Sequence, residues 1–207
     1  MVAILTGDVV NSSKLTTEQR SALINKLEQF LEVQKKKYSD MEFEMYRGDA
    51  VQIKLYQPDK SITLAIIIRV FVLSLGSDIR ISIGIGDIDI TEKEIKISSG
   101  QAFVFSGHSL DNMKSRDRLV FKSPYEKLDV DINVANNIMM ALINMWTLNR
   151  SKIMLHLLLG ISRDEICKKF GFGNPTLSKT LLGAGYPELK DAIQWAENKI
   201  NSYLDIC

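Results

Sequence analysis

Cysteines and long apolar runs are both scarce in this chain of 207 residues. The two cysteines, Cys167 and Cys207, are too few for the disulfide framework of a small secreted domain, so a cytoplasmic location is expected. The most apolar run, Ile62 to Gly76, is shorter than the roughly 20 residues that span a bilayer, and it contains Arg69. We therefore expect a buried helix there and no membrane partner.

An excess of charge of one sign is also lacking. The 26 lysines and arginines against 25 aspartates and glutamates give a net charge of +1, so no overall field attracts nucleic acid or a membrane, and any such binding requires a local patch. The start of the chain has neither the basic region nor the long apolar core of a signal peptide. With 45% hydrophobic and 25% charged residues, the composition is typical of a globular protein with a buried core.

The first part of the chain alternates between strand and helix patterns. Val2 to Thr6 is a continuous apolar run, which is typical of a central strand, and the capping box at Thr16 to Gln19 predicts the start of a helix. Glu42 to Tyr46 and Ala50 to Leu55 alternate as the two strands of a hairpin do, with Arg47-Gly48-Asp49 as the turn between them.

A helix over residues 62–75 and a strand over residues 79–85 follow this hairpin. The resulting order of strand, helix, strand, strand, helix, strand predicts an α+β fold of the split βαβ, ferredoxin-like kind. A helix near Ser109 to Ser115 and a strand at Leu119 to Phe121 are expected to extend it.

The pattern changes after Pro124, because helical spacing continues to the end of the chain without a convincing strand. We therefore expect a ferredoxin-like domain over residues 1–127 and an all-α domain over residues 128–207. The first long helix of the second domain, at about residues 132–148, is expected to act as a connector or as a dimerisation element.

Two acidic residues are expected to meet at one end of the sheet. Asp8 follows the central strand, and Asp49 lies at the tip of a hairpin that belongs to the same sheet. Two neighbouring carboxylates repel each other unless a cation neutralises them, and Mg²⁺ or Mn²⁺ takes such oxygen ligands together with substrate phosphate. The alternative is that both aspartates are ordinary turn residues.

The segment around Asp8 carries backbone donors and hydroxyl groups just before a helix, which is a pattern that can hold phosphate. The candidate residues for binding a phosphate or nucleotide are Gly7, Val9, Asn11, Ser12, Ser13 and Arg47.

A second motif lies near the C-terminus. Ser162 to Glu165 forms a capping box, Gly171 and Gly173 predict a tight turn, and Asn174 is expected to cap a second helix with Pro175 at its first position. A short helix, a glycine turn and a second capped helix have the spacing of a helix-turn-helix, whose second helix enters the major groove of DNA. Leu177, Leu181 and Leu182 are expected to form the buried side of the second helix.

The candidate DNA-binding residues are Arg163, Lys168, Lys169, Asn174, Thr176, Ser178 and Lys179. Basic and acidic residues balance over the whole of residues 128–207. Non-specific affinity for DNA depends on basic contacts to phosphate, so a neutral domain predicts weak binding by a single copy. The alternative is a small helical bundle that contacts a protein partner.

Three segments carry a family resemblance. "AILTGDVVNSS", "YRGDAVQIKL" and "IRISIGIGD" resemble the signature segments of class III nucleotide cyclase domains, in which the two aspartates bind metal ions. "GQAFVFSGHSLDNMKSRDRLVF" is similar to the closing segment of the SatD family of bacterial proteins. That resemblance implies a cyclase-like palm domain followed by a helix-turn-helix, over nearly the whole chain.

The resemblance is incomplete at the positions that perform cyclisation. Cyclases have an asparagine and an arginine four residues apart, where this chain has Asp111 and Ser115, with Arg116 one place away. The lysine that selects the base is replaced by Met45. A carboxylate in place of an amide repels phosphate, and without the arginine the transferring phosphoryl group is poorly stabilised.

The sequence therefore predicts a DNA-binding regulator with a metal- or nucleotide-binding palm, which functions as a homodimer. Ser82, Gly84 and the apolar helix at residues 62–75 are candidate dimer surfaces. Two alternatives stay open: a metal-dependent nucleotidyl- or phosphoryl-transfer enzyme with a helical partner-binding domain, and a degenerate palm used for dimerisation alone.

Overall fold

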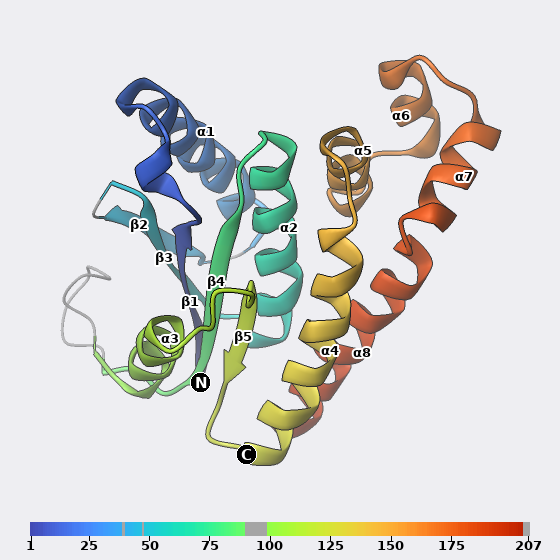
Figure 1. The fold of residues 1–207 in the computed structure, drawn as a ribbon. Helices are drawn as coiled ribbons and strands as arrows, with labels where there is room; N and C mark the ends of the chain where they lie inside the picture. Colours follow the sequence, from blue (N-terminus) through green and yellow to red (C-terminus); the bar gives the residue numbers. More distant parts are fainter. Residues whose placement is uncertain (39, 47, 90–98, 205–207) are drawn as a thin grey trace.

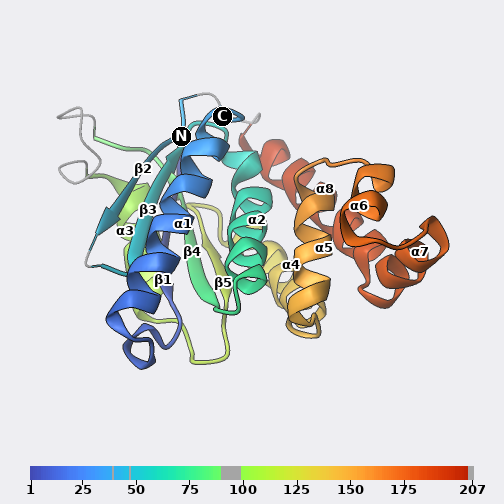
Figure 2. The ribbon, with the colours of Figure 1, turned by 90° about the horizontal axis from the view of Figure 1, so that it is seen from above.

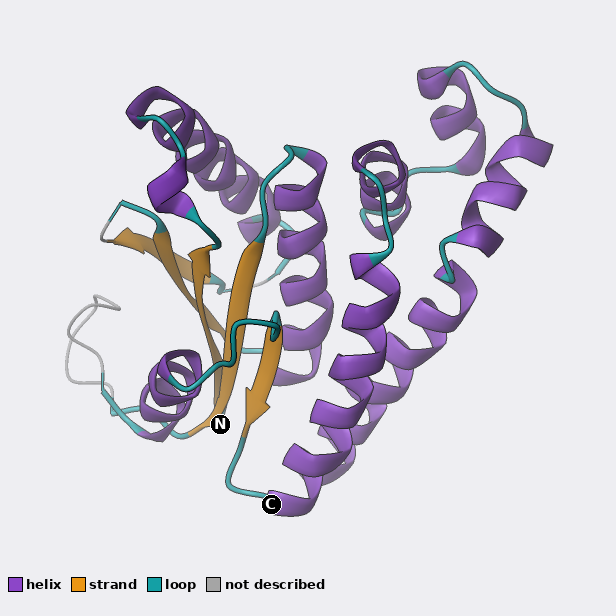
Figure 3. Cartoon of the chain, in the orientation of Figure 1, coloured by secondary structure: helices purple, strands orange, loops and turns teal. Residues whose placement is uncertain are grey.

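The computed structural model describes residues 1–38, 40–46, 48–89 and 99–204. In these residues the chain has an α+β fold, in which a five-stranded mixed sheet is combined with eight α-helices. Figures 1 and 3 show the strands gathered on one side and a purely helical half on the other. In the described part of the chain, no helix combines the length and the apolar character that crossing a membrane requires.

The sheet has the strand order β2-β3-β1-β4-β5, so β1 is its central strand. Neighbouring strands are antiparallel, except for β4 and β5, which are parallel. The strands are β1 (Val2–Val9), β2 (Glu42–Tyr46), β3 (Ala50–Leu55), β4 (Ile79–Gly86) and β5 (Leu119–Lys122).

The helices divide between the two halves of the molecule. Those that accompany the sheet are α1 (Thr17–Lys35), α2 (Ser61–Ser74) and α3 (Gln101–Asp111), with short 3₁₀ helices at Ser12–Lys14 and Pro58–Lys60. Those of the helical half are α4 (Glu126–Asn144), α5 (Leu148–Leu158), α6 (Arg163–Phe170), α7 (Asn174–Gly183) and α8 (Tyr186–Leu204).

The two faces of β1 are covered by different helices, because successive side chains of a strand point to opposite faces. Ala3 and Leu5 join the main hydrophobic core beneath α1 and α2. Val2 and Ile4 instead pack with Ala102 of α3 in a second, smaller cluster. In Figure 2 the sheet accordingly lies between α3 on one side and α2 on the other.

Helix α2 lies between the sheet and the helical half, and it packs against β4 as well as against α5 and α8. The main hydrophobic cluster contains buried side chains from both halves, so the two predicted domains share a core. Polar contacts also join the halves: Glu197 of α8 accepts hydrogen bonds from Lys60, at 2.8 Å, and from Thr63. The division after residue 127 stays a prediction.

Several local predictions agree with the structure. The hairpin strands β2 and β3 have the predicted bounds, and Thr16 and Gln19 form the predicted capping box. The predicted helix at residues 109–115 is wrong, because α3 covers Gln101–Asp111 instead. The long helix of the C-terminal half begins at Glu126, six residues before the predicted start.

The predicted dimer surfaces are wrong. Ser82 is fully buried and donates a hydrogen bond to the backbone oxygen of Ser106 at 2.6 Å. A Cβ atom on Gly84 would lie 2.2 Å from the backbone oxygen of Ala102, so α3 lies directly against this part of β4. Most residues of α2 are likewise buried. The small side chains of β4 therefore serve packing within the chain.

Candidate functional site

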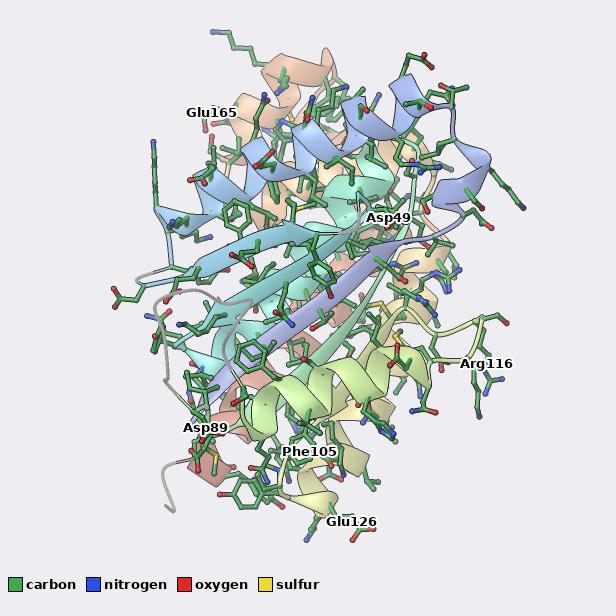
Figure 4. All side chains as sticks on the ribbon, turned by 90° about the vertical axis from the view of Figure 1, so that its left-hand side faces the viewer. Asp49, Asp89, Phe105, Arg116, Glu126 and Glu165 are labelled. Atoms are coloured by element: carbon green, nitrogen blue, oxygen red, sulfur yellow. The ribbon has the colours of Figure 1, made fainter. Side chains whose placement is uncertain are left out.

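The end of β1 and the tip of the β2–β3 hairpin are neighbours. Asp8 is paired with Ala50 in the antiparallel ladder, and the Val9 amide donates to the Asp49 backbone oxygen at 3.1 Å. Figure 4 looks onto the face covered by α3 and shows Asp49 at the end of the sheet. The fold therefore brings the two predicted metal ligands to the same end of adjacent strands.

Each of the two carboxylates already has a partner in the protein. Arg80 of β4 binds Asp8 through two hydrogen bonds, Nε to Oδ1 at 2.6 Å and Nη2 to Oδ2 at 2.7 Å. These bonds raise the pKa of Arg80 further above its usual value, because they favour the charged guanidinium. Asp49 accepts a hydrogen bond from the hydroxyl of Ser12 in the turn after β1.

This arrangement does not fit a divalent cation as it stands. Both oxygens of Asp8 face a guanidinium group, so a cation would have to displace Arg80 or share those oxygens with it. Among the described residues, no three His, Cys, Asp or Glu side chains come together as a metal-binding group. The Mg²⁺ or Mn²⁺ site at Asp8 and Asp49 stays a prediction, and no catalytic step is derived through it.

The predicted phosphate-binding residues lie in different environments. Gly7 and Val9 are buried in β1, where the Val9 amide is already bonded to the hairpin. Asn11 and Ser13 are exposed, and Asn11 adopts a left-handed conformation with φ of 56°. Ser12 is half-buried, and the predicted residue Arg47 lies outside the described part of the chain.

A cavity of about 400 Å³ lies beside Asp8 and the turn that follows β1. It is lined by Asp8, Val9, Val10, Asn11, Arg80, Ser115 and Arg118. Three of the predicted site residues therefore border one hollow. The cavity also contains two guanidinium groups, which are the side chains best suited to hold phosphate or carboxylate through paired hydrogen bonds.

Arg80 and Arg118 were not predicted from the sequence. Arg118 is held in place by Asp78, which accepts from its Nε at 2.7 Å and also accepts from Nε of the buried Arg69 at 2.9 Å. Arg80 stands directly opposite Asp8 in the β1–β4 ladder. The alternation along β4 marks Arg80 as facing away from the main core, but nothing local to Arg118 indicates its role.

Helices α6 and α7 form the second candidate site. The predicted capping box is present: the Ser162 hydroxyl accepts from the Glu165 amide at 3.3 Å, and the Ser162 amide donates to the Glu165 side chain at 3.1 Å. Helix α6 ends at Phe170, and the next residue, Gly171, has a left-handed φ of 72°, a conformation that costs glycine little. Two short helices thus meet through a tight three-residue turn.

The start of α7 differs from the prediction. Gly173 occupies the capping position, and Asn174 is the first helical residue, so the predicted cap at Asn174 is wrong. The Asn174 side chain instead donates to the Asp164 carboxylate at 3.2 Å, which fastens the start of α7 to α6. Leu182, predicted to be buried, is 70% exposed.

The predicted DNA-binding residues share one property, which is access to solvent. Arg163, Lys168, Lys169, Asn174, Thr176 and Lys179 are exposed, and Ser178 is half-buried. Arg163 of α6 donates to the Ser178 hydroxyl of α7 at 2.6 Å, so the two helices carry a joint polar surface. Ile166 and Leu177 are buried beneath it and join both helices to the core.

Neither a family model nor a curated protein matches this chain.

Proposed function

We propose that this protein is a DNA-binding regulator in which α6 and α7 form a helix-turn-helix. In this proposal α7 is the helix that enters the major groove, and the sheet half binds a regulatory ligand. The chain functions as a homodimer, which doubles the number of contacts that a single domain offers to DNA.

The observation that carries the proposal is the exposed polar surface of α6 and α7. Between residues 162 and 185 there are four basic residues against two acidic ones, although the whole C-terminal half is neutral. Lys168, Lys169 and Lys179 are exposed there and are not used in an ion pair among the described residues. Exposed cations that the fold does not use are available to phosphate groups.

We propose further that the sheet half is a ferredoxin-like palm and that the chain belongs to the SatD family. The strand order β2-β3-β1-β4, with β1 in the centre, supports the first statement. The second rests on the sequence resemblance alone.

The ligand that we propose for the sheet half is a phosphate-bearing molecule such as a nucleotide. The cavity beside Asp8 supports this, because Arg80 and Arg118 line it together with Asn11, and a phosphate would compete with Asp8 for Arg80 and with Asp78 for Arg118. An enzyme of metal-dependent phosphoryl transfer is the alternative, and it requires Arg80 to release Asp8 so that the carboxylate can hold a cation.

The test of DNA binding is the salt dependence of affinity for a fluorescent duplex, measured by anisotropy between about 50 and 200 mM salt. Replacing a lysine that contacts phosphate should lower the slope of log K against log salt by about 0.9. We expect this change for Lys179→Ala. Lys36→Ala removes another exposed lysine, just after the end of α1, and is the matched control.

Two results would overturn the proposal. One is the absence of measurable binding at low salt by the wild-type protein, with and without nucleotide. The other is an equal loss of slope in Lys179→Ala and Lys36→Ala, which would mean that the contact surface is not α7.

A further inference from the structure

A second cavity, of about 560 Å³, lies between helix α4 and the loop of residues 112–118 that leads into β5. It therefore lies between the helical half and the sheet half, and its volume is typical of sites for small molecules. Arg118 lines this cavity as well as the cavity beside Asp8, so the two hollows border on one shared side chain. None of the site residues predicted from the sequence is among its described lining residues.

The wall on the α4 side carries amide groups. Asn133, Asn137 and Asn144 follow one another at steps of four and seven residues, which keeps them on one side of the helix. Asn133 is used by the fold, because its side chain bonds to the amide and the oxygen of Phe121 in β5, at 2.9 and 2.7 Å. Asn137 is exposed and has no hydrogen-bond partner in the described part of the chain. Its side chain is therefore available to a ligand both as donor and as acceptor.

A buried arginine holds the other polar groups of the cavity in place. Arg69 of α2 is 2% exposed, and it donates to Asp78 from Nε at 2.9 Å and to the Asn144 Oδ1 atom from Nη2 at 2.5 Å. Asp78 in turn accepts from Nε of Arg118 at 2.7 Å. One network thus fixes a wall residue on α4 and a wall residue on the loop. Groups that are fixed before a ligand arrives lose less conformational entropy when it binds.

Arg118 keeps one donor that the fold does not use. Its Nη1 atom donates to the backbone oxygens of Ser115 and Asp117, each at 2.8 Å, and its Nε atom is bonded to Asp78. Its Nη2 atom has no hydrogen-bond partner among the residues that the structure describes. A phosphate oxygen at Nη2 would compete with Asp78 for the charge of the guanidinium group, but not for the hydrogen bond at Nε.

Positive charge is in excess on this side of Arg118. Lys114 and Arg116 also line the cavity, and Asp117 is the one carboxylate in its described lining. Asp117 accepts from the Lys114 backbone amide at 3.0 Å and lies 3.8 Å from Nε of Arg116, which Figure 4 shows at the outer side of the loop. The buried carboxylate and guanidinium described above add one charge of each sign, so the excess is two positive charges.

The cavity beside Asp8 has no such excess. Asp8 binds Arg80 through two hydrogen bonds, and these bonds, followed by the negative charge of Asp111, raise the pKa of Arg80. Two carboxylates therefore act on the one guanidinium group that this cavity does not share with its neighbour. An anionic group is accordingly held better on the α4 side of Arg118.

The rest of the lining is apolar. Leu119 and Met140 are buried, at 4% and 6% exposure, and Val120 and Ala141 complete this surface. A ligand that fills the cavity thus meets cations from the loop, amides along α4 and an apolar surface, whereas an inorganic ion would use the cations alone. The combination suits an organic phosphate whose uncharged body has hydrogen-bonding groups and an apolar face, as the nucleoside part of a nucleotide has.

We propose that this cavity binds a nucleotide or a related organic phosphate, with its phosphate groups at Lys114 and Arg118 and its uncharged body against Asn137 and Asn144. The inference rests on the proposed function for the class of ligand, and it assigns that ligand to a cavity with one wall in each half of the molecule. It requires neither a metal ion at Asp8 nor DNA binding.

The first test is calorimetric titration of the intact protein, without added metal, with inorganic pyrophosphate and with ADP, GDP, CDP and UDP. We expect at least one nucleoside diphosphate to bind about tenfold or more tightly than pyrophosphate, because its body adds contacts with α4. Lys114→Ala should weaken both kinds of ligand by about fivefold or more. Asn137→Ala should weaken the nucleoside diphosphate by about three- to tenfold and leave pyrophosphate unchanged.

Lys36→Ala and Asn149→Ala are the matched controls, because they remove an exposed lysine and an exposed asparagine that do not line the cavity. Both should bind all of these ligands as the wild type does. Equal affinity of Lys114→Ala and Lys36→Ala would overturn the inference.

The second test locates the ligand without weakening its binding. In protein labelled with ¹³C at the methionine methyl groups, the NMR signal of Met140 should shift on saturation with the tightest of these ligands, because this side chain lines the cavity. The signal of Met41, which is buried next to β2, should stay in place. Met140→Leu and Met41→Leu assign the two signals. A Met140 signal that does not move at saturation would overturn the inference.

Asn11→Asp separates this cavity from the one beside Asp8. Asn11 is exposed and lines that cavity but not this one, and its left-handed conformation is one that aspartate also adopts. We expect Asn11→Asp to weaken binding less than Lys114→Ala does. Binding that Asn11→Asp abolishes, and that Lys114→Ala and Asn137→Ala leave unchanged, would overturn this inference and leave the proposed function intact.

Two further results have distinct meanings. Pyrophosphate that binds as tightly as every nucleoside diphosphate would show that the uncharged body makes no contact, which overturns the inference. The absence of binding by all of these ligands at millimolar concentration would overturn both this inference and the ligand that we propose for the sheet half.

Discussion

Replacing Gly84 by alanine should separate α3 from the sheet. A Cβ atom at this position would lie 2.2 Å from the Ala102 oxygen and 2.5 Å from the Ser106 nitrogen, and both are backbone atoms of α3. Backbone atoms cannot rotate away as a flexible side chain can, so the helix itself has to move. That movement would also strain the hydrogen bond from Ser82 to the Ser106 oxygen, which is 2.6 Å long.

The expected cost follows from the two overlaps. Overpacking of a core typically costs about 1–3 kcal/mol, and two contacts with backbone place Gly84→Ala at the upper end. Removing a glycine from a strand returns about 0.5–1 kcal/mol, so the net loss of stability is about 2–2.5 kcal/mol. For a chain of this size that corresponds to a fall in Tm of about 4–10 °C.

Gly107→Ala provides a control within the same helix. Gly107 lies in α3, and a Cβ atom there would meet no atom within 4 Å. Alanine is favoured over glycine in a helix by about 0.8–1.0 kcal/mol, so this variant should be slightly more stable than the wild type. Thermal and urea denaturation followed by circular dichroism measure both. A Gly84→Ala protein as stable as Gly107→Ala would refute the close approach of α3 to β4.

Two further predictions concern titration and ligand binding. Burial, and then the negative charge of Glu197, raise the pKa of Tyr38 to about 12. The stability that the protonated Tyr38 hydroxyl contributes is therefore complete below pH 10. It is lost as the pH rises from 10 to 12, by about 1.4 kcal/mol per pH unit. Urea unfolding at pH 10 to 12 should show that Tyr38→Phe loses less free energy of unfolding than the wild type does. Tyr56→Phe, at an exposed position, should lose as much as the wild type, and equal losses in all three proteins would contradict the raised pKa of Tyr38. Calorimetry with ATP or GTP, with and without Mg²⁺, should show binding to the wild type. Ser115→Glu should weaken that binding at least tenfold, because it places a negative charge in the cavity beside Arg118. Ser202→Glu, at an exposed position, should leave the binding unchanged. Absence of heat at millimolar nucleotide would remove the ligand proposal.

The sequence predicts best where the signal is local. The hairpin of β2 and β3 and the capping boxes at Thr16 and Ser162 depend on residues within a few positions of one another, and all are present. Helix α3 was misplaced because Ser106, Gly107 and His108 are weak helix formers, whereas packing against β4 holds the whole segment helical.

The candidate site was predicted in part. Asp8 and Asn11 do border a cavity, and the hairpin does bring Asp49 to the same end of the sheet. The ion pair of Asp8 with Arg80 joins residues 72 positions apart, and the bond of Arg118 to Asp78 spans 40. Such pairs depend on strand order and register, which no short motif encodes.

The position of α2 limits how this protein can be dissected genetically. One side of α2 packs on the sheet and another packs on α5 and α8, so a fragment that ends at residue 127 would leave the largely apolar second side of α2 uncovered. Truncation would then report aggregation and not the loss of one activity. Surface point substitutions in the intact chain are the appropriate way to assign a function to either half.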